Sequence, residues 1–347
     1  TDQHLGKEFY GDFGRFEVEL TLPAKYVVEA TGELQNSETV MPEALKQKLN
    51  IQNFKEKAWN QPPSDITLGL EGSKTWIYHA DHVHDFAWTC DPTYRIGRSV
   101  AKLPGGRTVE CIAVAQEQHA SGWQNAADYT AQVIEFYSSE IGEYAYPKMV
   151  VADARDGMEY PMLTLDGGRD PGYRDLLAHE IAHNWFYGMV GNNETYRAAL
   201  DEGFTQFLTS RCMEHLEGDS MDLNTNRTGL DKFFFEPQRT RDQQVYNGYF
   251  RSVITADRDP QLNTHSDQFL HHRDYGQVYY KTATMLYNLE YVLGEGLFEE
   301  ALQHYFNQWK FCHPYFDDFR TSIIQYTEVD LNWFFDQWLE STKRIDY

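Results

Sequence analysis

The front of the chain alternates apolar and polar residues in the way that half-buried β-strands do. Residues 16–22 read Phe-Glu-Val-Glu-Leu-Thr-Leu and stop at Pro23, which predicts a strand. Two further β-like runs cover 26–30 and 75–79. Residues 42–59 are polar and helix-compatible, so we expect a surface insertion there. The pattern therefore predicts a mainly β front.

Beyond this front the apolar spacing changes. The turn cluster Pro104-Gly105-Gly106 marks the predicted boundary between an N-terminal β-rich domain, 1–105, and a second domain, 106–347. The fold class is thus α+β. The second domain is predicted to begin with strands at 107–114 and 149–152 around a helix at 128–141, and to end with helices at 279–293, 297–309, 316–326 and 331–339.

Residues 179–183 read His-Glu-Ile-Ala-His within a segment of helical periodicity. Asp170-Pro171 has the form of an N-cap followed by a first-turn proline, and Gly188 can end the helix. Leu177, Ile181 and Trp185 recur every four residues on the side opposite the histidines. The apolar side is therefore expected to fix the helix while the histidines face a site.

His179 and His183 are four residues apart, so a helix places both imidazoles on one face. Imidazole suits zinc, and catalytic zinc takes three protein ligands and keeps one open position. Glu180 lies beside this pair and is placed to accept a proton from water. The alternative is a pair of core histidines satisfied by hydrogen bonds.

The third ligand separates the classes of zinc peptidase. After His183 the sequence lacks the Gly and His that the metzincin pattern requires. Glu202 stands nineteen positions after His183 and opens a second apolar-periodic stretch. A glutamate from a following helix is the gluzincin arrangement, so His179, His183 and Glu202 are the candidate ligands of one Zn²⁺ ion.

At this point the sequence resembles the M1 family of zinc aminopeptidases, whose signature is HExxH, eighteen residues and Glu. His-Asn-Trp-Phe and Leu-Asp-Glu-Gly-Phe, at 183–186 and 200–204, resemble the family's His-Gln-Trp-Phe and Leu-Asn-Glu-Gly-Phe. The run 157–161, Gly-Met-Glu-Tyr-Pro, resembles its Gly-x-Met-Glu-Asn exopeptidase motif, and 278–281 resembles the segment with its catalytic tyrosine. The resemblance is most specific over 150–290.

The resemblance implies roles for particular residues. Glu180 would be the general base and Tyr279 the donor to the developing oxyanion. Glu159 would hold the free α-amine of a peptide, with Gly157 and Met158 beside it in the substrate site. The substrates would be peptides with a free N-terminus.

Two positions depart from the family pattern. Tyr160 replaces the Asn that follows the motif's Glu, and Asp201 replaces the Asn before the ligand Glu. Neither change removes a ligand or a catalytic group. We expect Tyr160 to reshape the pocket for the first substrate side chain.

The resemblance also implies the layout of an N-terminal β domain followed by a thermolysin-like catalytic domain. The family's β domain is longer and another domain commonly follows the catalytic one, so we expect this chain to be the central piece of a longer enzyme. The polar, aromatic stretch 224–274 is too long for a simple connection and is expected to wrap the active-site cleft.

Composition narrows the possible partners. The formal net charge of −23 argues against binding to nucleic acid or anionic membranes, and no apolar run is long enough to span a membrane. Cys90, Cys111, Cys212 and Cys312 are irregularly spaced, which favours isolated buried thiols. The chain begins Thr-Asp-Gln without Met, so its lack of a leader is no evidence for the cytoplasm. We expect an extracytoplasmic protein, secreted or periplasmic, slightly more than a cytoplasmic one.

Two other functions fit the same motif. One is a zinc endopeptidase that does not need a free amine, and the other is a catalytically silent scaffold that binds peptides. Comparing the cleavage of peptides with blocked and with free amines distinguishes an endopeptidase from an aminopeptidase. Measuring the zinc content distinguishes a silent scaffold from an enzyme. The sequence offers no basis for assigning an oligomeric state.

Overall fold

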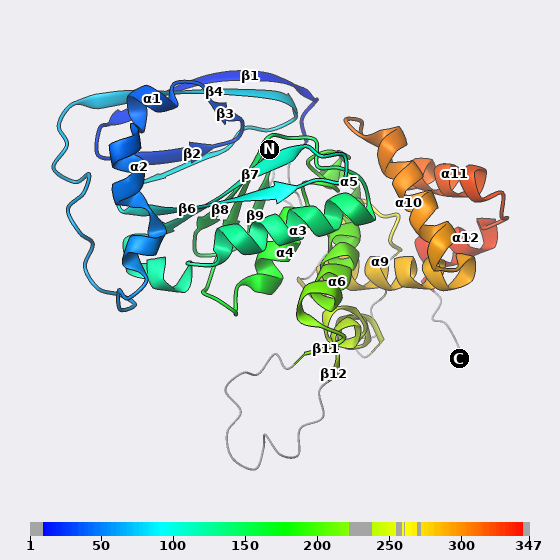
Figure 1. Cartoon of the computed structure of the whole chain (residues 1–347). Coiled ribbons are helices and arrows are strands. Elements are labelled where there is room, and N and C mark those ends of the chain that lie inside the picture. The colour runs from blue at the N-terminus through cyan, green and yellow to red at the C-terminus, as the bar shows by residue number, and fades with distance from the viewer. Residues whose placement is uncertain (1–9, 222–237, 255–258, 260, 269–271, 343–347) are drawn as a thin grey trace, which may run out of the picture. The chain divides into compact units, whose positions relative to one another are not determined.

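The computed structural model describes residues 10–221, 238–254, 259, 261–268 and 272–342 (Figure 1). Its chain divides into two compact units. The β-rich unit comprises residues 11–190 and 310–312, and the helical unit comprises 1–10, 191–309 and 313–347. The predicted order, a β-rich front followed by a helical part, is confirmed.

The β-rich unit is built on a five-stranded sheet of order β6-β7-β8-β10-β9. Strands β7, β8 and β10 are parallel, whereas the two edge strands are antiparallel to their neighbours. Helices α3 and α4 pack on this sheet (Figure 1). The bounds are β6 Tyr94–Lys102, β7 Thr108–Gln116, α3 Ala126–Glu140, β8 Lys148–Asp153, β9 Met158–Tyr160, β10 Leu163–Asp166 and α4 Arg174–Ala182.

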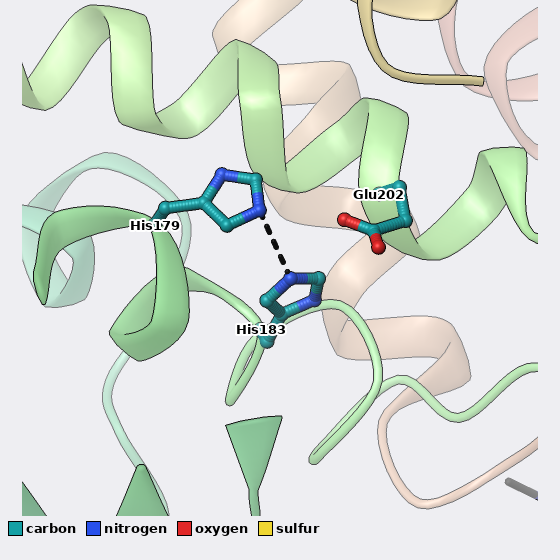
Figure 2. A group of neighbouring side chains, drawn as sticks. All are labelled: His179, His183 and Glu202. Atoms are coloured by element: carbon teal, nitrogen blue, oxygen red, sulfur yellow. Dashed lines mark hydrogen bonds between the residues drawn. The ribbon is translucent and has the colours of Figure 1, made fainter. Parts of the chain in front are cut away.

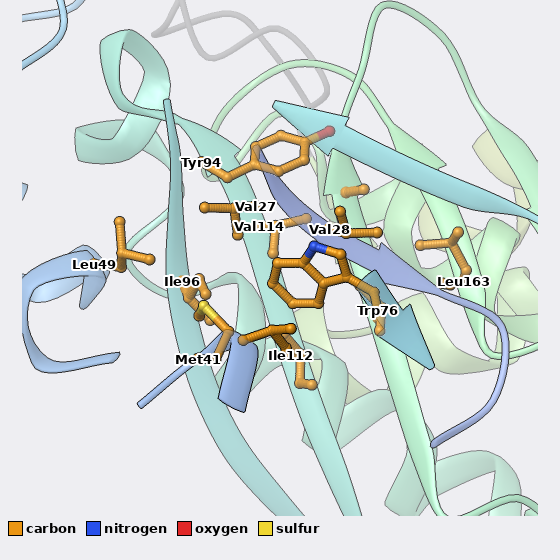
Figure 3. Close-up of a cluster of buried hydrophobic side chains, with 14 of the residues drawn as sticks. Val27, Val28, Met41, Leu49, Trp76, Tyr94, Ile96, Ile112, Val114 and Leu163 are labelled. Carbon is orange, nitrogen blue, oxygen red and sulfur yellow. The ribbon is translucent and has the colours of Figure 1, made fainter. Parts of the chain in front are cut away.

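Two smaller sheets supply the rest of this unit's core. One has the order β1-β4-β3 and the other pairs β2 with β5. Val28, Trp76 and Ile112, from β2, β4 and β7, meet in one buried cluster with residues of β6, β8 and β10 (Figure 3). The remaining bounds are β1 Gly14–Pro23, β2 Val27–Ala30, β3 Glu33–Leu34, α1 Ser37–Val40, α2 Glu43–Leu49, η1 Ile51–Phe54, β4 Ser73–Val83, β5 Trp88–Asp91 and η2 Glu117–Gly122.

The turn at 104–106, predicted as a domain boundary, joins β6 to β7, which pair antiparallel along nine residues each. Because a hairpin of this length shares one ladder of hydrogen bonds, the chain continues within one sheet across the turn. The two compact units divide near residue 190, and the domain boundary at 105 stays a prediction.

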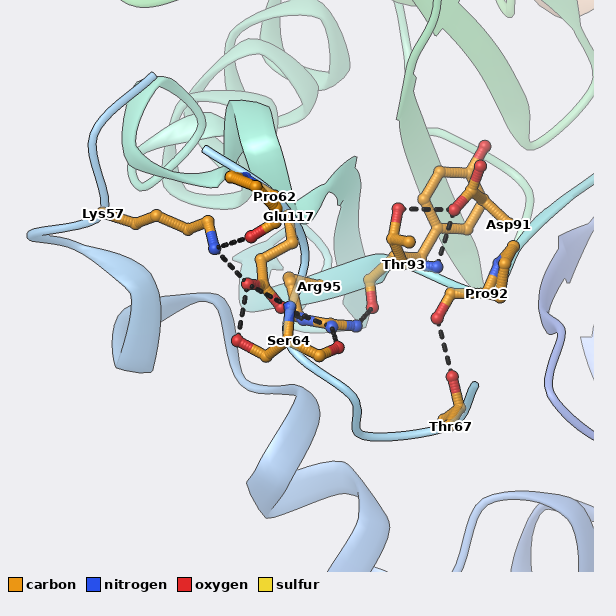
Figure 4. A network of polar contacts seen from close by, with 10 residues as sticks. Lys57, Pro62, Ser64, Thr67, Asp91, Pro92, Thr93, Arg95 and Glu117 are labelled. Carbon is orange, nitrogen blue, oxygen red and sulfur yellow. Dashed lines mark hydrogen bonds and ion pairs between the residues drawn. The ribbon is translucent and has the colours of Figure 1, made fainter. Parts of the chain in front are cut away.

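A buried ion pair fixes the end of β7 to a preceding segment (Figure 4). The Nε of Arg95 donates to Glu117 Oε2 at 2.8 Å, and both side chains are fully buried. The backbone N–H and the hydroxyl of Ser64 donate to Glu117 Oε1, as does the Lys57 ammonium. Burial alone would raise the pKa of Glu117, but these donors lower it to about 2.

We predict that Glu117→Gln lowers the free energy of unfolding by about 3–5 kcal/mol, because removing one partner leaves a buried guanidinium uncompensated. Since the folded pKa lies below the ordinary value of about 4.3, the carboxylate's contribution is fully present above that pH. It is lost as the pH falls towards 2. Denaturant titrations at pH 7 and pH 3 measure both effects.

Glu110 offers a matched control for this prediction. It lies on β7 and pairs with Arg98 of β6, and both side chains are about half exposed. Exposed ion pairs contribute about 0–1 kcal/mol, so Glu110→Gln should change stability little. An equal loss in the free energy of unfolding for the two variants would contradict the larger contribution that we assign to the buried pair.

The helical unit follows the predicted periodicity. The helices expected at 279–293, 297–309, 316–326 and 331–339 are confirmed as α9 to α12. Phe204 and Phe207 of α6 pack edge-to-face on Phe319 and Phe298. The bounds are α5 Glu194–Arg197, η3 Ala199–Gly203, α6 Phe204–Glu217, β11 Ser220–Met221, β12 Gln238–Arg239, η4 Asp242–Tyr246, α8 Asn247–Tyr249, η5 Phe250–Ile254, η6 Ser266–Gln268, α9 His272–Leu293, α10 Glu295–Trp309, α11 Phe316–Thr327 and α12 Asn332–Leu339.

The stretch predicted to wrap the cleft, 224–274, lies partly outside the described residues. Its described part is more regular than expected, because 242–254 forms consecutive helical turns packed on α9. Gly248 permits this packing, since a Cβ there would collide with the ring of Tyr280. The expected burial of the cysteine thiols is confirmed for Cys111 and Cys212, whereas Cys90 is half-buried and Cys312 is exposed. Over the described residues, no helix is both long and apolar enough to cross a bilayer.

Candidate metal centre

Helix α4 carries the two histidines but begins later than predicted. Its first residue is Arg174 and its N-cap is Tyr173, so the N-cap assignment to Asp170 was wrong. The carboxylate of Asp170 is used elsewhere: it accepts from Arg174 Nε at 2.7 Å and from Asn125 Nδ2 at 2.9 Å. An aspartate held by these side chains does not cap the backbone N–H groups of the first turn.

The apolar side of α4 is placed as predicted. Leu177, Ile181 and Trp185 are fully buried, and the Trp185 indole donates to the Gly142 carbonyl at 2.8 Å. The regular helix ends at Ala182, before the predicted end at Gly188. His183 is its C-terminal cap, and the N–H groups of Asn184 and Trp185 then donate to carbonyls three residues back.

The two imidazoles face each other across one turn. His179 Nε2 lies 3.2 Å from His183 Nε2, and the rings meet edge-to-face (Figure 2). Two nitrogens that each lie about 2.0–2.1 Å from a tetrahedral ion are about 3.3–3.4 Å apart. The separation therefore fits two ligands of one zinc ion.

Glu202 lies in the π-helical turn η3, directly before α6, and its side chain is buried. The hydroxyl of Tyr279, on α9, donates to Glu202 Oε1 at 2.5 Å. Gly203 lets η3 lie against α9, because a Cβ there would be 2.6 Å from the Val278 carbonyl oxygen. Single π-helical turns occur frequently at functional sites, and this one fixes the side chain of Glu202.

His179, His183 and Glu202 each offer one ligand atom, and these three atoms lie within 4.8 Å of one another (Figure 2). Two imidazole nitrogens and one carboxylate oxygen form a donor set that suits zinc. Figure 2 shows Glu202 beside the two rings. The residues present therefore fit the ion that the motif implies.

Glu180 and Glu159 form a second buried group with His183. A carboxylate oxygen of each lies within 4.8 Å of the other and of a His183 nitrogen. Gly157 borders this group so closely that an added Cβ would lie 2.8 Å from the carboxyl carbon of Glu180. A larger residue at position 157 would displace the carboxyl group of Glu180, which the sequence motif alone did not show.

The edge strand β9 determines which side chains share a face. Glu159 is paired with Thr164 of β10 and is buried, whereas Met158 and Tyr160 alternate to the other face. Tyr160 packs against the hydrophobic cluster of the smaller sheets. By this alternation Tyr160 and Glu159 lie on opposite faces of the strand, and the expected effect of Tyr160 on the pocket for the first substrate side chain stays a prediction.

One supporting residue was not predicted. The side-chain oxygen of Asn184 accepts from the Met162 N–H at 2.9 Å and from the Tyr144 hydroxyl at 3.2 Å. Asn184 thereby joins the end of α4 to the segment between β9 and β10. Its place in the His-Asn-Trp-Phe motif was the available signal, but its partners could not be seen in the sequence.

Comparison with known proteins shows what this chain is similar to. Residues 170–338 match the sequence model of the Peptidase family M1 domain. The fold is similar to that of the M1 zinc metallopeptidase from Deinococcus radiodurans, with a TM-score of 0.70 and 16% identity over 97% of this chain and 66% of that one. It is also similar to Legionella pneumophila aminopeptidase A, with a TM-score of 0.65 and 16% identity over 94% of this chain and 34% of that one.

The matched segment, residues 170–338, covers just under half of the chain and is similar to the peptidase family M1 domain. Two curated relatives are both called leucine aminopeptidase 2. The protein from Ajellomyces capsulatus is 22% identical over 78% of this chain and 42% of its own length. The protein from Yarrowia lipolytica is 27% identical over 45% of this chain and 24% of its own length. The chain thus spans less than half the length of these relatives.

Proposed function

We propose that this protein is a zinc-dependent aminopeptidase that hydrolyses the N-terminal peptide bond of peptides. The observation that carries the proposal is the grouping of His179, His183 and Glu202 beside the buried Glu180. The M1 match and the relatives named leucine aminopeptidase support it. A variant of the Deinococcus radiodurans metallopeptidase was crystallised with a Tyr-Ser-Ala substrate, which supports peptides as the substrate class.

In this proposal His179, His183 and Glu202 hold one Zn²⁺ ion. When bound, the ion supplies Lewis acidity, which lets a water molecule give up a proton near neutral pH and polarises a carbonyl group. Tyr279 fixes the orientation of Glu202 through their hydrogen bond of 2.5 Å. Partners of this kind orient ligands and tune their basicity.

Glu180 is the general base of the proposed reaction. It follows His179 directly on α4, so it stands beside the two imidazoles, and its side chain is buried. Its carboxylate accepts the proton of the attacking water and returns that proton to the leaving amine. Gly157 leaves space for this carboxylate, because a Cβ at position 157 would require the carboxyl group to shift.

Glu159 gives the proposed reaction its preference for chain ends. It is buried, and its carboxylate lies near that of Glu180. An ammonium inside a buried site must be paired, because its desolvation is costly. A fixed carboxylate in this place therefore selects a free α-amine and sets the cut one residue from the end.

One variant of Tyr279 separates two roles of its hydroxyl, which are donation to the oxyanion and orientation of Glu202. If the hydroxyl donates to the oxyanion that develops in the transition state, Tyr279→Phe should lower kcat by about 10²–10³-fold and leave KM nearly unchanged. Zinc content should stay at one equivalent when zinc is supplied in excess, although loss of the hydrogen bond to Glu202 is expected to weaken zinc affinity by about 10–100-fold. Steady-state kinetics and metal analysis on the same preparation measure all three quantities.

Tyr280 is the neighbouring control. It lies on the same helix and its ring packs against Gly248, so Tyr280→Phe should leave kcat within about threefold of the unmodified protein. Loss of zinc in Tyr279→Phe would show that the hydroxyl serves only to hold Glu202. If kcat were unchanged in Tyr279→Phe and severely reduced in Tyr280→Phe, the donor to the oxyanion would be Tyr280 and not Tyr279.

The proposed function is tested with purified protein and a panel of amino-acid amides. We expect hydrolysis that a chelator abolishes and that stoichiometric zinc restores. A protein with less than about half an equivalent of zinc and no turnover would favour the silent scaffold, because a catalytic centre needs one ion.

A further inference from the structure

A histidine and an aspartate outside the candidate metal centre form a close, mostly buried pair. Asp153 is the last residue of β8 and its side chain is 5% exposed. Its Oδ2 lies 2.7 Å from His119 Nδ1 and accepts the Gln116 N–H at 3.1 Å. Because a carboxylate can only accept, His119 Nδ1 is the donor in the ionised pair.

The segment that follows Asp153 leads directly to the substrate-binding motif. Residues 154–157 connect Asp153 to Gly157, and Glu159 follows on β9. The Ala154 N–H donates to the Asp166 carbonyl at 2.7 Å. At the far end, Gly157 lies against the carboxyl group of Glu180. A displacement of the segment at Asp153 would therefore move the backbone that borders Glu180 and Glu159.

His119 is itself held from the other side. It belongs to η2, and its ring stacks on Trp59 with centroids 4.5 Å apart and an interplanar angle of 19°. The Arg169 guanidinium covers the same indole at 5.3 Å. The Gly122 carbonyl, at the end of η2, accepts the Asp170 N–H at 3.0 Å. The ring thus has a fixed place from which to orient Asp153.

We propose that His119 and Asp153 are a positioning pair that sets the segment 154–157, and through it Gly157 and Glu159, at the depth required to bind a substrate's free amine. The role rests on the proposed aminopeptidase function. Neither residue touches the reacting atoms in this proposal. The pair acts on binding because the segment it holds ends at the residues assigned to the α-amine.

The test compares three variants of the full chain, assayed with an amino-acid amide. His119→Ala removes the donor and should raise KM at least about tenfold, since a 1 Å misplacement can cost about 100-fold. Its kcat should stay within about threefold and its zinc content should be unchanged. In His119→Asn the amide can reach the position of Nδ1, so KM should return close to that of the unmodified protein.

His79 supplies the matched control. Its Nε2 lies 2.9 Å from Asp81 Oδ2, and its side chain is 24% exposed against 25% for His119. It lies on β4, whose pairing partners are β1 and β3. His79→Ala should therefore leave KM unchanged. An equal rise in KM for His79→Ala and His119→Ala would overturn the proposal, because it would show a general loss of stability.

A measurement independent of activity keeps this inference separate from the proposed function. Hydrogen exchange at the Ala154 amide should become faster in His119→Ala and stay slow in His119→Asn and His79→Ala. If the unmodified protein hydrolyses no amide, the proposed function fails, and the positioning pair, which rests on it, falls with it. Unchanged KM together with unchanged Ala154 exchange in His119→Ala would overturn the inference while leaving the proposed function intact.

Discussion

Replacement of Glu180 by glutamine is expected to reduce kcat by about 10²–10⁴-fold, the usual contribution of a general base. The amide keeps the size and shape of the carboxyl group but cannot accept a proton at neutral pH. Because the imidazoles of His179 and His183 are unaffected, the variant should keep one equivalent of zinc. The substrate should still bind with a similar KM.

The experiment pairs single-turnover kinetics with metal analysis on each preparation. Glu135→Gln is the control, because this glutamate lies on α3 and accepts the Lys102 N–H away from the imidazoles. Turnover close to that of the unmodified protein, in a zinc-loaded Glu180→Gln variant, would rule out the assigned role. A variant that has also lost its zinc would show that Glu180 contributes to metal binding.

Replacement of Glu202 by alanine is expected to empty the metal site. Zinc would lose one of three protein ligands, and the loss of even an outer hydrogen-bond partner costs about 10–100-fold in affinity. We therefore expect at least a ~100-fold rise in the zinc dissociation constant and no measurable turnover at limiting zinc. Equilibrium titration with a competing chelator gives the dissociation constant directly.

Glu217, at the C-terminal end of the helix that follows Glu202, is the control. Glu217→Ala should keep its zinc and its turnover. A full equivalent of tightly held zinc in Glu202→Ala would mean that the third ligand is another residue. Circular dichroism on each variant separates loss of the ligand from loss of the fold.

The parts of the site that the sequence could predict depend on short spacings along one helix. Two histidines four residues apart must share a face of a helix, and the structure places their Nε2 atoms 3.2 Å apart. Leu177, Ile181 and Trp185 were predicted to be buried for the same local reason, and they are. Helices α9 to α12 were found because their apolar periodicity is long and regular.

The parts that could not be predicted depend on partners far apart in the chain. Asp170 has the form of an N-cap, but Arg174 and Asn125 engage its carboxylate, so α4 begins later. Tyr160 stands next to Glu159 in the motif, yet the alternation of an edge strand separates their side chains. The contact of Asp153 with His119 spans 34 positions and has no motif. Only the folded chain reveals such pairs.

The most direct test of the central claim is the hydrolysis of one short peptide in two forms, with a free and with an acetylated N-terminus. We predict that the zinc-loaded protein releases the first residue of the free peptide and leaves the acetylated peptide intact. Glu159→Gln should reduce kcat/KM for the free peptide by at least ~10-fold, about 1.4 kcal/mol, as expected for one lost charge-assisted contact. Efficient internal cleavage of the acetylated peptide would contradict the aminopeptidase assignment and identify a zinc endopeptidase instead.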